Sequence, residues 1–290
     1  MHIFVEQIVN GLVNGCIYAL IAIGLTMVYG ILHVINLAHG EIFMIGAFVA
    51  YACYTLTGSY AAAIVGAILV TAFVGLLIER LVFRPLARQA RINTLIASVG
   101  LSLVLSNAAL VLSHGTPHFY LTPLSGQIVH VGFLSITAQR ILIVAVTLAL
   151  IGALTAFYRW SRLGKALRAA AQDLEACSLV GIETRWLVVV SFVLGAALAG
   201  VAGSLLSPIY TITYDMGLPA VMKAFAVVIV GGFGNIPGTV LAGVLLGVAE
   251  SLGGGFISAT YQDSIVFVIL AIALIVRPTG LVGERVDENI

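Results

Sequence analysis

Long apolar stretches recur along this chain, and most are long enough to cross a lipid bilayer as a helix. Such a crossing needs about 20 mostly apolar residues. Only 9% of the residues are charged, against roughly 25% in soluble domains. The sequence therefore predicts an all-α, polytopic membrane protein with about 8–9 transmembrane segments in a single domain, 1–290. The apolar stretches are 7–31, 41–56, 61–79, 93–113, 139–158, 186–206, 219–234, 239–255 and 263–276.

Two places interrupt the helical pattern and predict broken helices. The run 219–255 is too long for one span, and the sequence GGFGNIPG at 231–238 divides it. Glycine and proline at this density do not continue a straight helix. The second interruption lies near 31–40. Broken helices expose free backbone groups, which is how transporters commonly build sites at membrane depth. The alternative at both places is a short turn in water.

The basic residues set the expected orientation. Eleven of the 13 Lys and Arg lie in three clusters, at 80–91, 159–185 and 277–285, whereas the loop 114–138 has none. By the positive-inside rule the three clusters are cytoplasmic. The number of spans between the clusters places all three on the same side of the membrane if 219–255 crosses it twice. The C-terminus and the loop 159–185 are then expected in the cytoplasm. The N-terminus, three spans before the first cluster, is expected outside.

The loop 159–185 has the pattern of an amphipathic helix over 167–178. One face is expected to carry Leu167, Ala170, Ala171, Leu174 and Ser178, and the other Lys165, Arg168, Gln172 and Glu175. Gly181 is a candidate C-cap, and Thr184 a candidate N-cap of the next helix. Such a loop either solvates a turn or docks a soluble partner through its small residues, which are Ala169, Ala170, Ala171 and Ala176.

Polar residues within apolar sequence are candidate functional residues, because burying them in a membrane is unfavourable. Ser98, Ser102 and Ser106 recur every four residues, so they either line a water path or bond to their own backbone. Two charged residues flank the outer end of the 219–234 span and are candidates for contact with a periplasmic partner, namely Asp215 and Lys223. The residues predicted to line a path are Asn36, His39, Gly40, Glu41, Ser98, Ser102, Gly231, Gly232 and Asn235.

The sequence shows no pattern typical of an enzyme site. It has no Ser–His–acid set in a plausible context, no metal-ligand cluster and no phosphate-binding loop. The three cysteines predict neither a disulfide framework nor a metal site, and the net charge of +1 does not suggest nucleic-acid binding. We therefore expect no catalytic activity, cofactor or metal. If ATP drives this protein, another chain must hydrolyse it.

Motifs along nearly the whole chain resemble those of bacterial branched-chain amino acid ABC transporter permeases, most closely the first-type (LivH-like) subunit. The opening motifs are GLTMVYG at 24–30 and INLAHGE at 35–41. The later ones are ER at 79–80, RPL at 84–86, SRLGKALRA at 161–169, GI at 181–182, KAF at 223–225, GGFGNIPG at 231–238 and RPTG at 277–280.

This resemblance implies a multi-pass protein of the bacterial inner membrane. Its implied partners are a homologous second permease, two cytoplasmic ABC ATPases that supply the energy, and a periplasmic protein that delivers leucine, isoleucine or valine. The loop 159–185 then corresponds to the segment that couples the permease to an ATPase. The family pattern of an acidic residue, two alanines and a later glycine matches loosely. The implied coupling residues are Gly164, Arg168, Ala170, Ala171, Asp173, Ala176 and Gly181.

Three alternatives remain open from the sequence. Relatives of this family carry urea, short amides or other amino acids, and the binding protein does most of the selecting. An ion-coupled secondary transporter or channel would need no ATPase, but it needs buried ionisable residues, which are scarce here. A structural membrane component would leave the amphipathic loop without a function.

Overall fold

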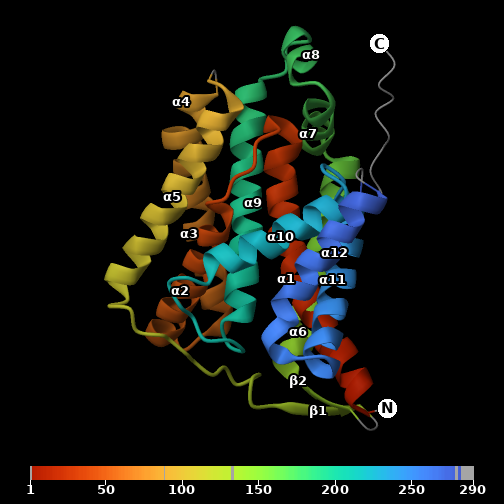
Figure 1. Ribbon diagram of the computed structural model, residues 1–290. Coiled ribbons are helices and arrows are strands. Elements are labelled where there is room, and N and C mark those ends of the chain that lie inside the picture. The colour runs from red at the N-terminus through yellow and green to blue at the C-terminus, as the bar shows by residue number, and fades with distance from the viewer. Residues whose placement is uncertain (1, 88, 132–133, 278–279, 282–290) are drawn as a thin grey trace.

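The computed structural model describes every residue of the chain except 1, 88, 132–133, 278–279 and 282–290. Within this part, eight helices are long and apolar enough to cross a membrane, which confirms the all-α polytopic prediction. They pack side by side in one bundle (Figure 1). Their bounds are α1 His2–Leu32, α2 His39–Thr57, α3 Tyr60–Ile78, α5 Arg91–Leu112, α6 Ala138–Trp160, α9 Thr184–Leu206, α11 Ile236–Phe256 and α12 Gln262–Val276. The last span reaches 18 residues because the 3-10 turn η2 (Ala259–Tyr261) leads directly into α12.

Helix α1 lies at the centre of the bundle. In its most apolar 18-residue stretch, 83% of the residues are buried inside the protein. The same share is 11% for α5, 11% for α6 and 6% for α12. Glycines allow its close contact with α11: a Cβ added at Gly15 would lie 2.7 Å from the carbonyl oxygen of Gly243. Small residues at such crossings let helix backbones approach closely in a bilayer. The outer helices α5, α6 and α12 instead present apolar surface to their surroundings.

The ninth predicted span is shorter than expected. Helix α10 (Gly217–Gly231) has only 15 residues and is not long enough to count as a crossing. It lies obliquely between α9 and α12 (Figure 1). A full crossing at this place therefore needs the preceding segment 207–216 as well as α10. Helix α3 continues through a π-helical turn, η1 (Glu79–Phe83), into α4 (Arg84–Leu86).

The two ends of the bundle differ in their content of basic residues. Helix α4 and the 159–185 loop, with its basic residues, lie at one end, and the N-terminus lies at the other (Figure 1). Some residues of the predicted basic clusters and motifs lie outside the described residues, namely Arg88, Pro278, Thr279 and Arg285.

The N-terminal end also carries an antiparallel hairpin that the sequence analysis did not predict, β1 (Ile128–Val131) and β2 (Leu134–Thr137). Before it, Tyr120 is buried and shares a hydrogen bond of 2.8 Å with Ser207. Burial raises the pKa of this phenol to about 12. The loop 113–127 is therefore anchored to the end of α9 by a neutral tyrosine.

Cysteine labelling tests the orientation of these two ends. In a chain without its three native cysteines, we expect Gln127→Cys to react with an impermeant thiol reagent added outside intact cells. Gln172→Cys should react only after the membrane is opened. Both positions are exposed, so accessibility within the fold does not bias the comparison. Gln127 directly precedes β1 and Gln172 ends α7, and these two elements lie at opposite ends of the bundle (Figure 1). Labelling of Gln172→Cys from outside would reverse the predicted orientation.

Candidate functional site

The interruption after α1 brings polar residues into the centre of the bundle. Helix α1 ends at Leu32 and α2 begins at His39, which confirms a break within 31–40. Asn36 and His39 are each 1% exposed, so the alternative of a turn in water is wrong. A Cβ added at Gly24 of α1 would lie 2.7 Å from Nε2 of His39. The start of α2 is thus packed against the middle of α1.

Glu41 is a buried carboxyl group at this break and is 2% exposed. The hydroxyl of Ser102 on α5 donates to its Oε1 at 3.0 Å. Its other oxygen, Oε2, lies against Gly217 at the start of α10 and has no hydrogen-bond partner in the described part of the chain. The partial positive charge of a helix N-terminus favours a carboxyl group at this place. Three helices therefore meet around one carboxyl group.

The serine stripe of α5 faces this region. The backbone N–H of Leu37 donates to Oγ of Ser98 at 3.3 Å, and Ser98 itself donates to the Leu95 carbonyl at 2.8 Å. Ser106 donates to the Tyr214 carbonyl, just before α10, at 3.1 Å. The stripe thus bonds partly to its own backbone, as one alternative expected, and also joins α5 to the break and to α10.

The other predicted path residues lie elsewhere. Gly231 and Gly232 are at the far end of α10, about 21 Å from its start at 1.5 Å per residue. Gly232 has a φ of 101°, which favours glycine. Oδ1 of Asn235 accepts from the N–H of Gly238 at 2.8 Å and caps α11. The structure therefore brings together the residues of the first break and α5, but not those of 231–238.

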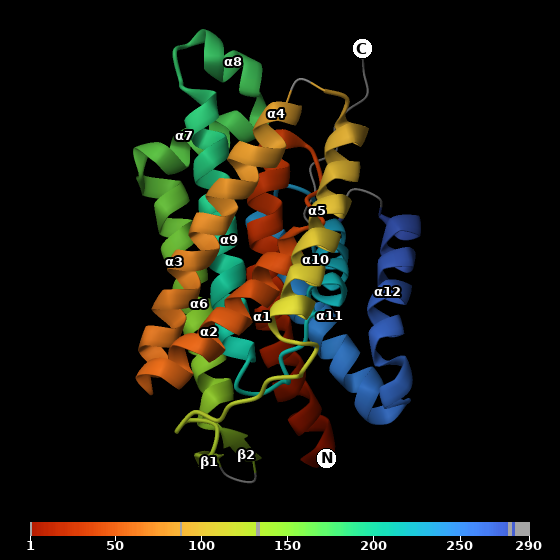
Figure 2. The ribbon, with the colours of Figure 1, turned by 90° about the vertical axis from the view of Figure 1, so that its left-hand side faces the viewer.

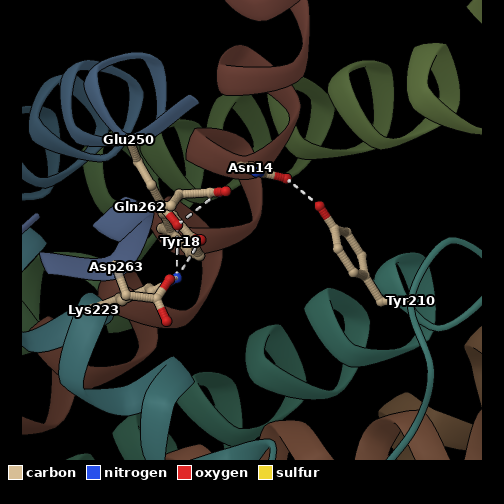
Figure 3. Close-up of polar contacts among 7 residues, drawn as sticks. All are labelled: Asn14, Tyr18, Tyr210, Lys223, Glu250, Gln262 and Asp263. Carbon is tan, nitrogen blue, oxygen red and sulfur yellow. Dashed lines mark hydrogen bonds and ion pairs between the residues drawn. The ribbon is translucent and has the colours of Figure 1, made fainter. Parts of the chain in front are cut away.

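A buried ionic cluster was missed by sequence reasoning (Figure 3). Nζ of Lys223 on α10 lies 2.7 Å from a carboxylate oxygen of Glu250 and 2.7 Å from one of Asp263. It also donates to the hydroxyl of Tyr18 at 3.2 Å. The Lys223 and Glu250 side chains are only 12% and 1% exposed. Lys223 is thus occupied within the protein, so the expectation that it meets a partner outside is wrong. The sequence did contain an indication of this cluster, because residues of opposite charge occur in neighbouring apolar helices.

The loop 159–185 contains two helices instead of the predicted continuous helix over 167–178. They are α7 (Arg162–Gln172) and α8 (Leu174–Leu179). Asp173 between them has an extended backbone, and its carboxylate accepts from the N–H groups of Glu175 and Ala176, both at 2.9 Å. An aspartate that caps a new helix in this way ends the preceding one.

Two helix caps were predicted in this loop, and the structure supports a helix-ending role for one of the two residues only. Helix α8 ends at Leu179 with Val180 as its C-cap, and Gly181 follows with a φ of 83°, so the predicted glycine terminates the helix one residue beyond the cap position. The N–H of the following Ile182 bonds to the carbonyl of Cys177 at 3.0 Å, which closes the turn. Thr184 is already inside α9 and Glu183 takes the N-cap position, so the predicted cap at Thr184 is wrong.

The small-residue face of α7 points into the bundle and not outward. Ala170 is 1% exposed and packs with Leu167, Ile31 and Leu187. Gly164 is buried where a Cβ would meet the backbone of α6. The prediction that Ala170 is presented to a groove is therefore corrected. Of the other predicted coupling residues, Ala171 is half-buried, and Arg168, Asp173, Ala176 and Gly181 are exposed; Ser178, expected on the inward face, is exposed too.

The end of α8 exposes apolar residues that sequence reasoning did not select. Leu179 is 88% and Val180 75% exposed, and α8 lies at the extreme end of the bundle (Figure 1). This position is beyond the membrane-spanning helices. This adjacent apolar pair beyond the spans is a candidate contact surface for a partner protein.

Comparisons with known proteins agree with this architecture. Residues 7–275 match the family described as the permease component of branched-chain amino acid transport systems. The chain is 42% identical to the high-affinity branched-chain amino acid transport system permease protein LivH of Escherichia coli K12, covering 99% of this chain and 98% of that protein.

It is 40% identical to the permease protein BraD of Pseudomonas aeruginosa PAO1, with the same coverage of 99% and 98%. Among solved structures, a putative metal-chelate type ABC transporter in an inward-facing conformation is similar in fold. That likeness has a TM-score of 0.51 and 17% identity, and covers 94% of this chain and 87% of that one.

Proposed function

Because this chain belongs to the family of permease components of branched-chain amino acid transport systems, we propose that it carries leucine, isoleucine and valine across a bacterial inner membrane. It acts as the membrane-spanning subunit of an ABC importer. The observation that carries this proposal is its likeness to LivH over 99% of the chain. The eight apolar helices and the polar break at the bundle centre support it.

The proposed orientation places the α7–α8 end and the C-terminus in the cytoplasm and the N-terminus in the periplasm. The arginines and lysine of the 159–185 loop support this, because they lie at the same end of the bundle as α4. The partners are a homologous second permease, two cytoplasmic ATPases and a periplasmic binding protein. They follow from the family resemblance, and from the lack of a phosphate-binding loop in the sequence.

The contacts of α7 suggest how ATP could drive the transport cycle. Nucleotide binding closes the two ATPases and displaces the α7–α8 segment that contacts them. Ala170 and Leu167 of α7 pack on Ile31 at the end of α1 and on Leu187 of α9. A displacement of α7 therefore reaches the end of α1, directly before the polar break. Nucleotide shifts the conformational equilibrium only through such a differential contact.

The polar break is the proposed part of the path for a zwitterionic amino acid. Asn36, His39, Gly40 and Glu41 lie there with Ser98 and Ser102 of α5, and Gly217 begins α10 beside them. Hydroxyl, amide and carboxyl groups next to small apolar residues suit a cargo with two opposite charges and an aliphatic side chain. Gly231, Gly232 and Asn235 are proposed instead to fix the turn between α10 and α11.

Vesicle uptake tests the energy source. The purified chain alone should hydrolyse no ATP, because it lacks a phosphate-binding loop. Leucine uptake by vesicles should require the partner ATPases and ATP, and should continue after the proton gradient is collapsed. An inactive ATPase that binds but does not hydrolyse ATP serves as the control. Uptake by this chain alone, driven by a pH gradient, would instead support an ion-coupled transporter.

A further inference from the structure

A cavity of about 770 Å³ lies at the α7 end of the bundle, outside the polar break. It is open on one side and is bordered by the last turns of α1 and α6, by α7, and by the turn 233–237. Its walls are largely apolar and include Met27, Ile31, Tyr158, Leu167, Phe233 and Ile236. This volume is within the range of small-molecule sites, about 300–1,000 Å³. The transport mechanism above uses the contact between two of these residues, Leu167 and Ile31, but assigns no ligand to the cavity.

Two arginines line one side of this cavity, Arg159 from α6 and Arg168 from α7. Both are exposed, and neither forms an ion pair with a residue in the described ranges. No aspartate or glutamate of the described chain lines the cavity. A planar guanidinium forms paired hydrogen bonds with phosphate and carboxylate oxygens. Two such groups without a balancing acid indicate an anionic ligand.

The two tryptophans of the chain indicate that the cavity lies near the level where lipid headgroups meet water. Trp160, next to Arg159, is 73% exposed, and Trp186 is exposed at the start of α9 at the same end. These are the two tryptophans of the chain, and tryptophan is enriched at membrane–water interfaces. Helix α6 forms one wall, and only 11% of the residues in its most apolar stretch are buried inside the protein. Figure 2 shows α6 and α7 on one side of α1, and α5 and α12 on the other side.

We propose that this cavity binds an anionic phospholipid of the cytoplasmic leaflet. The phosphate bonds to Arg159 and Arg168, and an acyl chain lies along the apolar wall. Basic pockets between transmembrane helices on the cytoplasmic side recognise such headgroups. A free phosphate ion would need the arginines but not the apolar wall, which favours the lipid. The proposal rests on the cytoplasmic orientation proposed above. A bound lipid would join α6 to α7, the helix that carries the coupling segment.

Native mass spectrometry of the full-length chain tests this site. The chain is titrated with dioleoylphosphatidylglycerol or dioleoylphosphatidylcholine, and retained lipid is counted. The wild-type chain should retain phosphatidylglycerol in preference. The double variant Arg159→Gln/Arg168→Gln should weaken this retention by roughly tenfold or more, since each basic residue near an anionic lipid contributes several-fold. The matched control Arg162→Gln/Arg185→Gln removes two exposed arginines of the same loop that do not line the cavity, and should retain the lipid.

Two further arms separate the sources of the phosphate and the role of the wall. An excess of inorganic phosphate should leave phosphatidylglycerol bound, whereas complete displacement would mean that the ligand is the free ion. Ala171→Phe fills the cavity from α7 and keeps both arginines, so it should also exclude the lipid. Equal retention by the two double variants, or no preference over phosphatidylcholine, would overturn the proposal. Lipid retention is measured without transport, so its outcome is separate from that of the uptake test.

Discussion

Lys223→Met is expected to destabilise the permease by about 3–5 kcal/mol, the usual effect of removing one partner from a buried ion pair. The variant leaves the carboxylate of Glu250, 1% exposed, without the ammonium group 2.7 Å away. One oxygen of that carboxylate already has no hydrogen-bond partner in the described part of the protein. The destabilisation should appear as a lower thermal midpoint of the detergent-solubilised chain.

Two companion variants make this expectation specific. Lys223→Met/Glu250→Gln removes both charges and should recover much of the lost stability, because a buried pair adds little over a neutral replacement. Asp263→Asn removes the partner that is 67% exposed, and should change stability by at most about 1 kcal/mol. If Lys223→Met and Asp263→Asn had equal effects, the ion pair with Glu250 would not stabilise the fold.

The helices were predictable because each depends on local sequence. Apolar length alone predicted α9 from 186–206, where the structure has Thr184–Leu206. The gap before His39 followed from a loss of apolar character with a glycine beside it. The length of α10 was not predictable from hydropathy. Its start at Gly217 is set by packing against Gly40 and Glu41, contacts between segments that are far apart in the sequence.

The site was predicted less well, because it depends on which side of a helix faces the bundle. Ala170 has the small side chain of a docking face, but the same property lets α7 pack closely on α1 and α9. Sequence periodicity identifies a face without saying what covers it. Asp173 illustrates a second limit, since a residue compatible with a helix surface instead caps a new helix. Lys223 and Glu250 were each visible as charges, but their pairing depends on how α10 crosses the bundle.

Leu179→Asp/Val180→Asp is expected to uncouple the permease from its proposed ATPase partner while leaving the permease folded and inserted. These side chains are 88% and 75% exposed at the tip of α8, so the substitutions disturb no internal packing. An apolar side chain buried against an ATPase contributes about 1.5–3 kcal/mol, and a carboxylate in its place would be buried without a partner. Co-purification of the ATPase and substrate-stimulated ATP hydrolysis should both fall by at least about tenfold for each residue changed.

The contrast with α7 decides whether α8 is the contact surface. Leu179→Met keeps the apolar surface and should preserve coupling. Ala170→Trp forces a large ring into a site that is 1% exposed, and overpacking of this kind destabilises a protein by about 1–3 kcal/mol or more. That variant should therefore lower the thermal midpoint of the permease itself, an effect that the α8 variants do not share. A contrary result would be normal ATPase binding by Leu179→Asp/Val180→Asp and loss of binding by a stable Ala170→Trp chain. It would mean that the ATPase contacts the face of α7 that the structure buries, and not α8.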